Sequence, residues 1–232
     1  MQQSISNKLI NCDLGECLSP NPDSQIMPLI GMASIACAGH VGDDKSMVKA
    51  IQLAQQNKVK IGVHPSYADQ ANFGRKSQAL SKSQLYELIH GQVAHFQQLC
   101  HQQGTVLEYI KPHGTLYHDM MSRTDVFEVL CEVIKAINPS LALVVQAGKE
   151  AHLEKFEKNQ KLTFLREVFA DRGYNGLQMI PRGEKNAVLD NSKAIVDQFW
   201  HFYNNKTLNI NTICFHSDNK ASVEALKCLK NA

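Results

Sequence analysis

The stretch Val106-Leu107-Glu108-Tyr109-Ile110-Lys111-Pro112-His113-Gly114 runs from an apolar segment directly into a lysine and a histidine. Its first five residues, Val106–Ile110, are mostly large and apolar, which is typical of a strand buried on both faces. The preceding segment, from Ser81 to Gly104, starts with capping-box spacing and has apolar residues at helical intervals. A helix followed at once by a buried strand indicates one unit of a parallel α/β fold.

The same transition from apolar to charged or imidazole side chains occurs in six segments: 11–16, 37–43, 62–65, 110–114, 166–172 and 214–218. A second helix is predicted from Thr124 or Asp125 to Asn138. Consecutive βα units close most simply into a barrel, so we expect an irregular, seven-stranded, TIM-like β/α barrel in one domain, residues 1–232. An open doubly wound sheet is the alternative, but no G-x-G-x-x-G follows the first strand. The seven predicted strands are Lys8–Cys12, Ala33–Cys37, Val59–Val63, Val106–Ile110, Leu141–Val145, Leu162–Val168 and Thr212–Phe215.

In such a barrel the C-terminal ends of all strands open onto one surface, so the six polar segments are expected to converge there. A polar residue at a strand end can also cap the next helix, and Asp43 and Asp218 are open to that interpretation. Four of the six segments carry a histidine, which is a poor cap and a common catalytic group. The pattern therefore favours an enzyme.

Composition narrows the class of partner. The chain has 232 residues and a formal net charge of +2 without a basic cluster, so neither nucleic acid nor a membrane surface is indicated, and a small-molecule substrate is expected. The N-terminal segment lacks the apolar core of a secretory signal and no segment has the length of a membrane span, which predicts a cytoplasmic protein. Seven cysteines without a C-x-x-C pair indicate reduced thiols, and Cys12, Cys37 and Cys214 are expected in the core.

Asp13 and Glu16 are candidates for an acid and base pair. They lie three residues apart just after the first predicted strand, and a like charge at short range raises the pKa of one member. One carboxyl group could then supply a proton while the other accepts one. The alternative is that Glu16 pairs with an arginine such as Arg75 or Arg172 and only shapes the site.

Three histidines, His40, His64 and His113, are candidates for proton transfer or for polarising a carbonyl group. His64 and His113 each adjoin a proline, which favours an extended segment. Lys111 is the candidate electrostatic group, because a strand end would let it meet a carboxylate or phosphoryl oxygen. Six other histidines fall on predicted helices or their flanks and are expected on the outer surface: His90, His95, His101, His118, His152 and His201.

Taken together, these motifs resemble the signature blocks of the LamB/YcsF family, whose characterised function is that of the A subunit of 5-oxoprolinase. The resemblance covers almost the whole chain. Some positions depart from the usual pattern: Ala38-Gly39-His40 stands where Gly-Phe-His is usual, and Ser66 and Ser217 stand where glycine is usual. The blocks that carry the resemblance are 11–16, 35–43, 62–67, 72–75, 111–117, 167–174, 180–182 and 213–218.

The resemblance implies an irregular β/α barrel related to polysaccharide-deacetylase-like enzymes. It also implies a hydrolase acting on a cyclic amide, which opens 5-oxo-L-proline to L-glutamate in an ATP-dependent reaction. This reaction would require two partner proteins, 5-oxoprolinase subunits B and C. A homo-oligomer is left open by the sequence.

A substrate of this kind gives a role to further residues near the strand ends. Arg172 has the bidentate fork suited to the carboxylate of 5-oxoproline, although an ion pair with Asp171 or Glu167 is the alternative. Arg75 lies in a long loop of the kind that forms lids, and aromatic side chains could line a ring-shaped pocket. The expected substrate-binding residues are Arg75, Tyr117, Glu167, Asp171, Arg172 and His216.

The resemblance suggests two cofactors to consider, ATP and a divalent metal. The chain has no G-x-x-x-x-G-K-[ST] segment, so ATP is expected to be bound mainly by the partner subunits. Asp13, His64 and His113 match in kind the metal ligands of the deacetylase-like relatives, although H-x-x-x-H spacing is absent. Two other functions stay open: a stand-alone metal-dependent amidohydrolase or carbohydrate deacetylase, and a non-catalytic subunit that binds a lactam.

Overall fold

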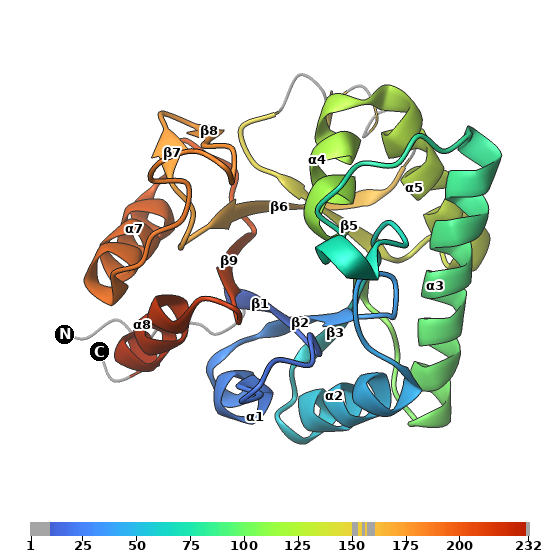
Figure 1. Ribbon diagram of the computed structural model, residues 1–232, viewed down its shortest axis with the longest axis horizontal. Coiled ribbons are helices and arrows are strands. Elements are labelled where there is room, and N and C mark those ends of the chain that lie inside the picture. The colour runs from blue at the N-terminus through green and yellow to red at the C-terminus, as the bar shows by residue number, and fades with distance from the viewer. Residues whose placement is uncertain (1–9, 150–152, 155, 157–160, 231–232) are drawn as a thin grey trace.

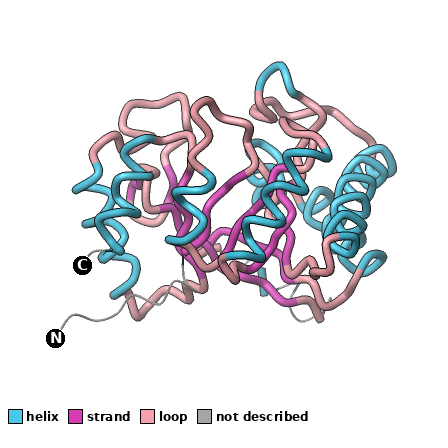
Figure 2. The backbone as a smooth tube through the Cα atoms, turned by 90° about the horizontal axis from the view of Figure 1, so that it is seen from below, coloured by secondary structure: helices cyan, strands magenta, loops and turns pink. Residues whose placement is uncertain are grey.

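A computed structural model describes residues 10–149, 153–154, 156 and 161–230, and its centre is a ring of strands with helices outside it (Figure 1). Figure 2 shows the same layering from below, with the strands inside and the helices around them. The strands are β1 (Ile10–Leu14), β2 (Met32–Ala36), β3 (Lys60–His64), β4 (Tyr109–Ile110), β5 (Ala142–Gln146), β6 (Thr163–Phe169), β7 (Tyr174–Asn175), β8 (Gln178–Met179) and β9 (Thr212–His216). The helices are α1 (Asp23–Ile26), α2 (Asp44–Gln56), α3 (Lys82–Gln102), α4 (Gly114–Ser122), α5 (Thr124–Ile137), α7 (Ser192–Asn204) and α8 (Lys220–Lys230). Two short 3-10 helices, η2 (Met27–Leu29) and η3 (Gln70–Asn72), lie in the connections.

Seven strands form a closed barrel in the order β1-β2-β3-β4-β5-β6-β9. Every neighbouring pair is parallel, including β1 and β9, which complete the ring. The predicted seven-stranded, irregular TIM-like barrel is therefore confirmed, and the open doubly wound sheet is wrong. Because all the strands run the same way, their C-terminal ends lie at one mouth of the barrel.

The predicted strand boundaries agree with the structure to within one or two residues, except at β4. The predicted strand began at Val106, whereas the observed one covers only Tyr109–Ile110. Val106 is 62% exposed, so its side chain does not pack in the core and burial does not stabilise a strand at this position. Pairing with β3 begins only where the N–H of Glu108 donates to the carbonyl of Ile61. The predicted start of the first strand, at Lys8, lies outside the described residues.

One insertion was not predicted. After β6 the chain forms the antiparallel hairpin of β7 and β8 before it reaches α7. The turn is made possible by Gly176, whose φ of +62° lies in the region that favours glycine. Two-residue strands carry too little periodicity to be recognised in the sequence. The hairpin matters because it builds one wall above the barrel mouth.

The helix ends follow the signals in the sequence. Ser81 accepts a hydrogen bond from the N–H of Gln84, and the Gln84 side chain in turn accepts one from the N–H of Ser81, as the capping box predicts. Asp43 caps α2 in the same way through Ser46, so its capping interpretation is confirmed.

The three cysteines expected in the core, Cys12, Cys37 and Cys214, are buried, and all seven cysteines are free thiols. They join a core of aliphatic and aromatic side chains that lies largely between the strands and the inner faces of the helices. In the described part of the chain, no helix combines the length and the apolar character that crossing a membrane would require.

Gly62 is the position in β3 where the packing is least tolerant. A Cβ atom there would lie 2.1 Å from the Tyr109 ring, which is buried and tied to Ser34 by its hydroxyl group. We expect Gly62→Ala to lower the free energy of unfolding by about 1–3 kcal/mol through overpacking. Gly91→Ala is the matched control, because a Cβ atom on that turn of α3 meets open space. It should instead stabilise by about 0.5–1 kcal/mol, and urea unfolding of both variants measures the difference.

Candidate functional site

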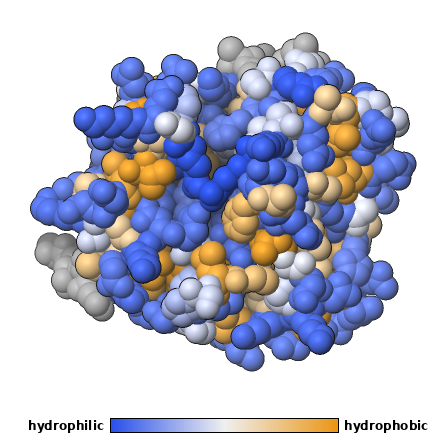
Figure 3. Space-filling model, viewed as in Figure 1, coloured by the Kyte–Doolittle hydropathy of each residue, from blue (hydrophilic) through white to orange (hydrophobic). Residues whose placement is uncertain are grey.

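A cavity of about 690 Å³ opens at the mouth formed by the strand C-termini. In Figure 3 this mouth appears as a hollow surrounded largely by hydrophilic side chains. Nine of the twelve residues predicted for the site line the cavity, whereas His40, Glu167 and Asp171 are buried behind its wall. The nine are Asp13, Glu16, His64, Arg75, Lys111, His113, Tyr117, Arg172 and His216.

Asp13 lies at the floor of the cavity, where β1 pairs with both β2 and β9. The register sets Asp13 beside Ser34 on one side and His216 on the other. Burial alone would raise the pKa of Asp13, but the nearby His64 and Lys111 outweigh it and hold that pKa well below its usual range. Asp13 is therefore an ionised carboxylate at neutral pH.

Lys111 is the cation that holds this carboxylate. Its Nζ lies 2.8 Å from Asp13 Oδ1 and 3.0 Å from Glu167 Oε1, and it also contacts Asn11 and Cys214. Burial would lower the pKa of Lys111, but the two carboxylates raise it well above its usual value. Lys111 stays charged, and its ammonium group is already surrounded by hydrogen-bond partners from the protein.

This arrangement corrects the role predicted for Lys111. The carboxylate that it meets is Asp13 rather than a group of the substrate, because its side chain points into the barrel and is only 2% exposed. Glu167, predicted to bind substrate, is fully buried and forms the other side of the same ion pair. Burial raises the pKa of Glu167, and Lys111 opposes that rise.

The second oxygen of Asp13 faces two imidazole rings. Oδ2 lies 3.4 Å from His64 Nε2 and 3.9 Å from His216 Nε2. The other nitrogen of His216, Nδ1, binds Asp171 at 2.8 Å. Burial opposes the charge on His216, yet Asp171 outweighs it and raises the pKa of His216. Asp171 therefore orients His216 and favours its protonated form, and it is buried outside the cavity lining.

Exchange of Asp171 for asparagine should lower the pKa of His216, because the charge that favours the imidazolium is removed. The wild-type ion pair stabilises the fold fully between about pH 4 and pH 6.5, the unfolded pKa values of the two groups. Its contribution is lost as the pH rises through the raised pKa of His216, or falls through the lowered pKa of Asp171. NMR titration of the His216 ring in both proteins measures the shift, and equal midpoints would contradict it.

Glu16 is the second carboxyl group at the mouth. Its Oε1 lies 3.7 Å from His40 Nε2 and 3.8 Å from His113 Nδ1, and its Oε2 accepts a hydrogen bond from Ser217. Burial, together with the charge of Asp13, raises the pKa of Glu16 well above its usual value. The environments of the two carboxyl groups thus shift their pKa values in opposite directions, as their spacing predicted.

The three candidate histidines form one cluster. His64 Nε2 and His113 Nδ1 are 2.9 Å apart, and the ring of His40 stacks on that of His113 with centroids 3.7 Å apart. Burial and the neighbouring imidazoles lower the pKa of His113, and burial and His64 lower that of His40 to about 3. His40 and His113 are therefore neutral rings at physiological pH.

Arg172 stabilises one wall of the cavity by binding main-chain carbonyls. Its Nε donates to the carbonyl of Ala187 and its Nη2 to the carbonyl of Ile180, both at 2.8 Å. These bonds tie the segment that follows the β7–β8 hairpin to the end of β6. The alternative, an ion pair of Arg172 with Asp171 or Glu167, is wrong, because Asp171 binds His216 and Glu167 binds Lys111. Carboxylate binding by Arg172 stays a prediction, and two of its N–H groups are already in use.

Asp218 connects two arginines at the rim. Arg75 Nη2 lies 2.9 Å and Arg182 Nη1 3.7 Å from Asp218 Oδ2. Asp218 therefore does not cap α8, and the neighbouring Asn219 accepts a bond from Ala221 in that role. Glu16 contacts His40, His113 and Ser217. The alternative pairing of Glu16 with Arg75 or Arg172 is therefore also wrong.

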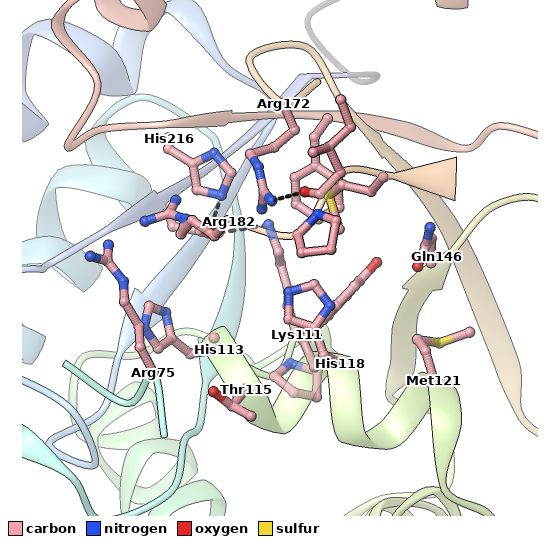
Figure 4. Close-up of a pocket in the computed structure, with 18 of the residues that line it drawn as sticks. Arg75, Lys111, His113, Thr115, His118, Met121, Gln146, Arg172, Arg182 and His216 are labelled. Atoms are coloured by element: carbon pink, nitrogen blue, oxygen red, sulfur yellow. Dashed lines mark hydrogen bonds and ion pairs between the residues drawn. The ribbon is translucent and has the colours of Figure 1, made fainter. Parts of the chain in front are cut away.

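Several lining residues were not predicted from the sequence. Figure 4 shows Arg182 close to Arg172 and His216, with Gln146 and Met121 at the other end of the cavity. Arg182 lies in the block 180–182, which was a usable signal. His118 was expected on the outer surface of a helix, and it lies on α4 but also lines the cavity mouth. Gln146 ends β5, and its neighbours in the sequence, Val145 and Ala147, are apolar, so no pattern marked it.

The comparisons with known proteins agree on the family. Residues 9–232 match the model of the LamB/YcsF family. The chain is 34% identical to the A subunit of 5-oxoprolinase from Pseudomonas fluorescens, over 98% of this chain and 97% of that protein. It is 35% identical to the corresponding 5-oxoprolinase protein from Vibrio cholerae, over 96% of each.

Two solved structures share the fold. A lactam utilization protein from Thermus thermophilus superposes with a TM-score of 0.84 at 24% identity, covering 96% of this chain and 95% of that one. A family 4 carbohydrate esterase from Streptomyces lividans superposes with a TM-score of 0.50 at 11% identity, covering 96% and 84%. At these identities the likeness concerns the fold alone.

Proposed function

The chain belongs to the LamB/YcsF family, and from this premise and the geometry of the cavity we propose that it opens the lactam ring of 5-oxo-L-proline to give L-glutamate. Relatives named as the A subunit of 5-oxoprolinase support a role in the metabolism of 5-oxoproline. The reaction is the hydrolysis of a cyclic amide. It requires one group that accepts a proton from water and one that gives a proton to the leaving nitrogen.

The observation that carries this proposal is a carboxylate with a lowered pKa beside an imidazole with a raised pKa on the cavity floor. Asp13 Oδ2 and His216 Nε2 are 3.9 Å apart. Their surroundings lower the pKa of Asp13 and raise that of His216, which suits Asp13 to accept a proton and His216 to donate one. Both side chains line the cavity, where a substrate can reach them.

In the proposed reaction, water attacks the lactam carbonyl carbon while Asp13 accepts a proton from that water. The carbonyl oxygen gains negative charge beside the cationic His216, which stabilises it. The bond between the carbonyl carbon and the ring nitrogen then breaks, and the nitrogen takes the proton of His216. Transfer of the proton from Asp13 back to His216 restores both groups and leaves the open-chain amino acid.

The other charged groups position Asp13 and His216. Lys111 binds the Asp13 oxygen that faces away from His216, which keeps the carboxylate ionised and fixes its direction. Asp171 holds His216 Nδ1, so that Nε2 points toward the cavity. For the carboxylate of 5-oxoproline we propose the cationic side of the mouth, where Arg75, Arg182 and Lys149 line the cavity.

We assign the ATP requirement to the complex rather than to this chain alone. A five-membered lactam is unstrained, so its opening has little driving force unless it is coupled to another reaction. No phosphate-binding loop is present in the sequence, and ATP is therefore bound mainly by subunits B and C in this proposal. The cytoplasmic location stays a prediction.

The test reconstitutes the reaction. The purified chain is mixed with 5-oxoprolinase subunits B and C, and glutamate formation from 5-oxoproline is followed with and without ATP. We expect glutamate only when all three proteins and ATP are present. Turnover of amides by the chain alone without nucleotide would instead identify a stand-alone amidohydrolase or deacetylase. Full activity of the complex with Asp13→Asn would identify a non-catalytic subunit.

A further inference from the structure

Two histidines at the cavity face each other through one ring nitrogen each, while the other nitrogen of each ring contacts a main-chain carbonyl. His64 Nδ1 lies 2.7 Å from the carbonyl oxygen of Lys111, and His113 Nε2 lies 2.9 Å from that of Phe73. A carbonyl oxygen only accepts, so each of these nitrogens carries the hydrogen of its ring. His64 Nε2 and His113 Nδ1 are the two remaining ring nitrogens; they face each other at 2.9 Å, and a metal ion would bind the lone pair of each.

A third imidazole nitrogen lies close by. The Ser66 hydroxyl donates to the carbonyl of Tyr67, so its oxygen accepts from His40 Nδ1 at 3.2 Å. This leaves a lone pair on His40 Nε2, which is buried and has no hydrogen-bond partner among the described residues. It faces Glu16 Oε1 at 3.7 Å. Three imidazole nitrogens and a carboxyl group thus meet in one buried place.

We propose that His64, His113 and Glu16 bind one divalent transition-metal ion of the zinc type. Their ligand atoms all lie within 4.8 Å of one another. Two nitrogens bound to one ion at 2.0–2.1 Å are about 2.9 Å apart at a right angle and about 3.4 Å apart at a tetrahedral angle. The observed separation of 2.9 Å falls at the lower end of this range.

The rest of the surroundings also suits a metal. A histidine that binds a metal usually donates its other ring hydrogen to a carbonyl or carboxylate, and both His64 and His113 do so here. Two histidines and one glutamate form a common catalytic set for zinc, with a position left for another ligand. Glu16 Oε1 is 3.8 Å from His113 Nδ1, about half an ångström more than an oxygen and a nitrogen on one tetrahedral ion. A small rotation of the Glu16 side chain closes this gap.

His40 is not one of the ligands. Its ring is parallel to that of His113 within 3°, with centroids 3.7 Å apart. An imidazole binds a metal in the plane of its ring, so two stacked parallel rings do not direct their lone pairs at one ion. His40 instead faces the Glu16 carboxylate.

A second group of possible ligands, Asp13, Cys214 and His216, is less suited to a cation. The ammonium group of Lys111 already lies 2.8 Å from Asp13 and 3.0 Å from Cys214. An ion placed there would meet this charge at short range. The proposed set shares His64 and His113 with the set considered from the sequence, and it has Glu16 in place of Asp13.

The test measures metal binding by the full chain after treatment with a chelator. Calorimetry with Zn²⁺ and visible absorption with Co²⁺ should both give one equivalent of bound ion. His64→Asn, His113→Asn and Glu16→Gln should each weaken binding at least as much as the roughly 100-fold that loss of an outer hydrogen-bond partner can cost. His118→Asn and His216→Asn are matched controls, because both side chains line the same cavity outside the set, and their affinities should stay unchanged.

A second measurement needs no variant and reads the nitrogens directly. In the ¹⁵N NMR spectrum, Zn²⁺ should shift His64 Nε2 and His113 Nδ1 while the other nitrogen of each ring keeps its hydrogen. The proposal is overturned if no stoichiometric binding occurs, if the three variants bind as well as wild type, or if His216→Asn is the change that abolishes binding. This proposal does not depend on the substrate, so the reconstituted glutamate assay can fail while metal binding holds, and the reverse.

Discussion

Replacement of Lys111 by methionine is expected to lower the free energy of unfolding by about 3–5 kcal/mol, the range seen when one partner of a buried ion pair is removed. The Lys111 ammonium group is 2% exposed and lies between the carboxylates of Asp13 and Glu167. Without it, both carboxylates must either stay charged in a buried site or take up a proton. Urea unfolding monitored by circular dichroism measures the loss.

Two further variants test whether the loss of stability comes from the buried charges rather than from removing a lysine in general. Lys60 forms a surface pair with Glu108 at 3.0 Å, and its side chain is 57% exposed. Lys60→Met should change the stability by no more than about 1 kcal/mol. Adding Glu167→Gln to Lys111→Met should restore part of the loss, because one of the two uncompensated charges is then removed. Equal losses for Lys60→Met and Lys111→Met would show that the buried charges are not the cause.

The second large effect concerns turnover. In the reconstituted complex, Asp13→Asn should lower kcat by about a hundredfold or more, because asparagine cannot accept the proton of water. The fold should survive, since the Asn side chain has nearly the same shape and its oxygen can still accept a bond from Lys111. The value of KM should change little if Asp13 acts mainly in the transition state.

The matched control for this prediction is Asp43→Asn. Asp43 is exposed and caps α2 through Ser46, away from the residues that line the cavity. Its replacement should leave kcat of the complex unchanged. Retention of normal turnover in Asp13→Asn, with the control also normal, would remove Asp13 from the proposed reaction.

The residues that line the barrel mouth were largely predictable because their signal is local. An apolar run marks each long strand, and the residue that follows it must lie at the barrel mouth whatever its partners. Asp13, His64 and His216 each stand at the C-terminal end of a strand, and all three line the cavity. The β7–β8 hairpin lacked such a signal, since two-residue strands show no period.

The partners of these residues could not be predicted, because they depend on how the barrel closes. Lys111 and Asp13 are 98 residues apart, and they meet because both side chains point into the same narrow ring. Arg172 adjoins Asp171 in the sequence, yet its guanidinium binds the carbonyls of Ala187 and Ile180, while Asp171 binds His216. Neighbours along a strand end point in different directions, so adjacency in sequence did not mean contact.

By itself, the sequence determined the seven strands, the mouth of the barrel and the kinds of side chain gathered there, because alternating apolar runs and polar ends are properties of short segments. Only the tertiary structure decided which groups are charged and which face a substrate. Closure of β1 against β9 brings His216 to Asp13. Burial and the neighbouring charges then shift the pKa values of Asp13 and Glu16 in opposite directions. These pKa shifts depend on distances between groups and on their exclusion from water, and neither can be read from the order of residues alone.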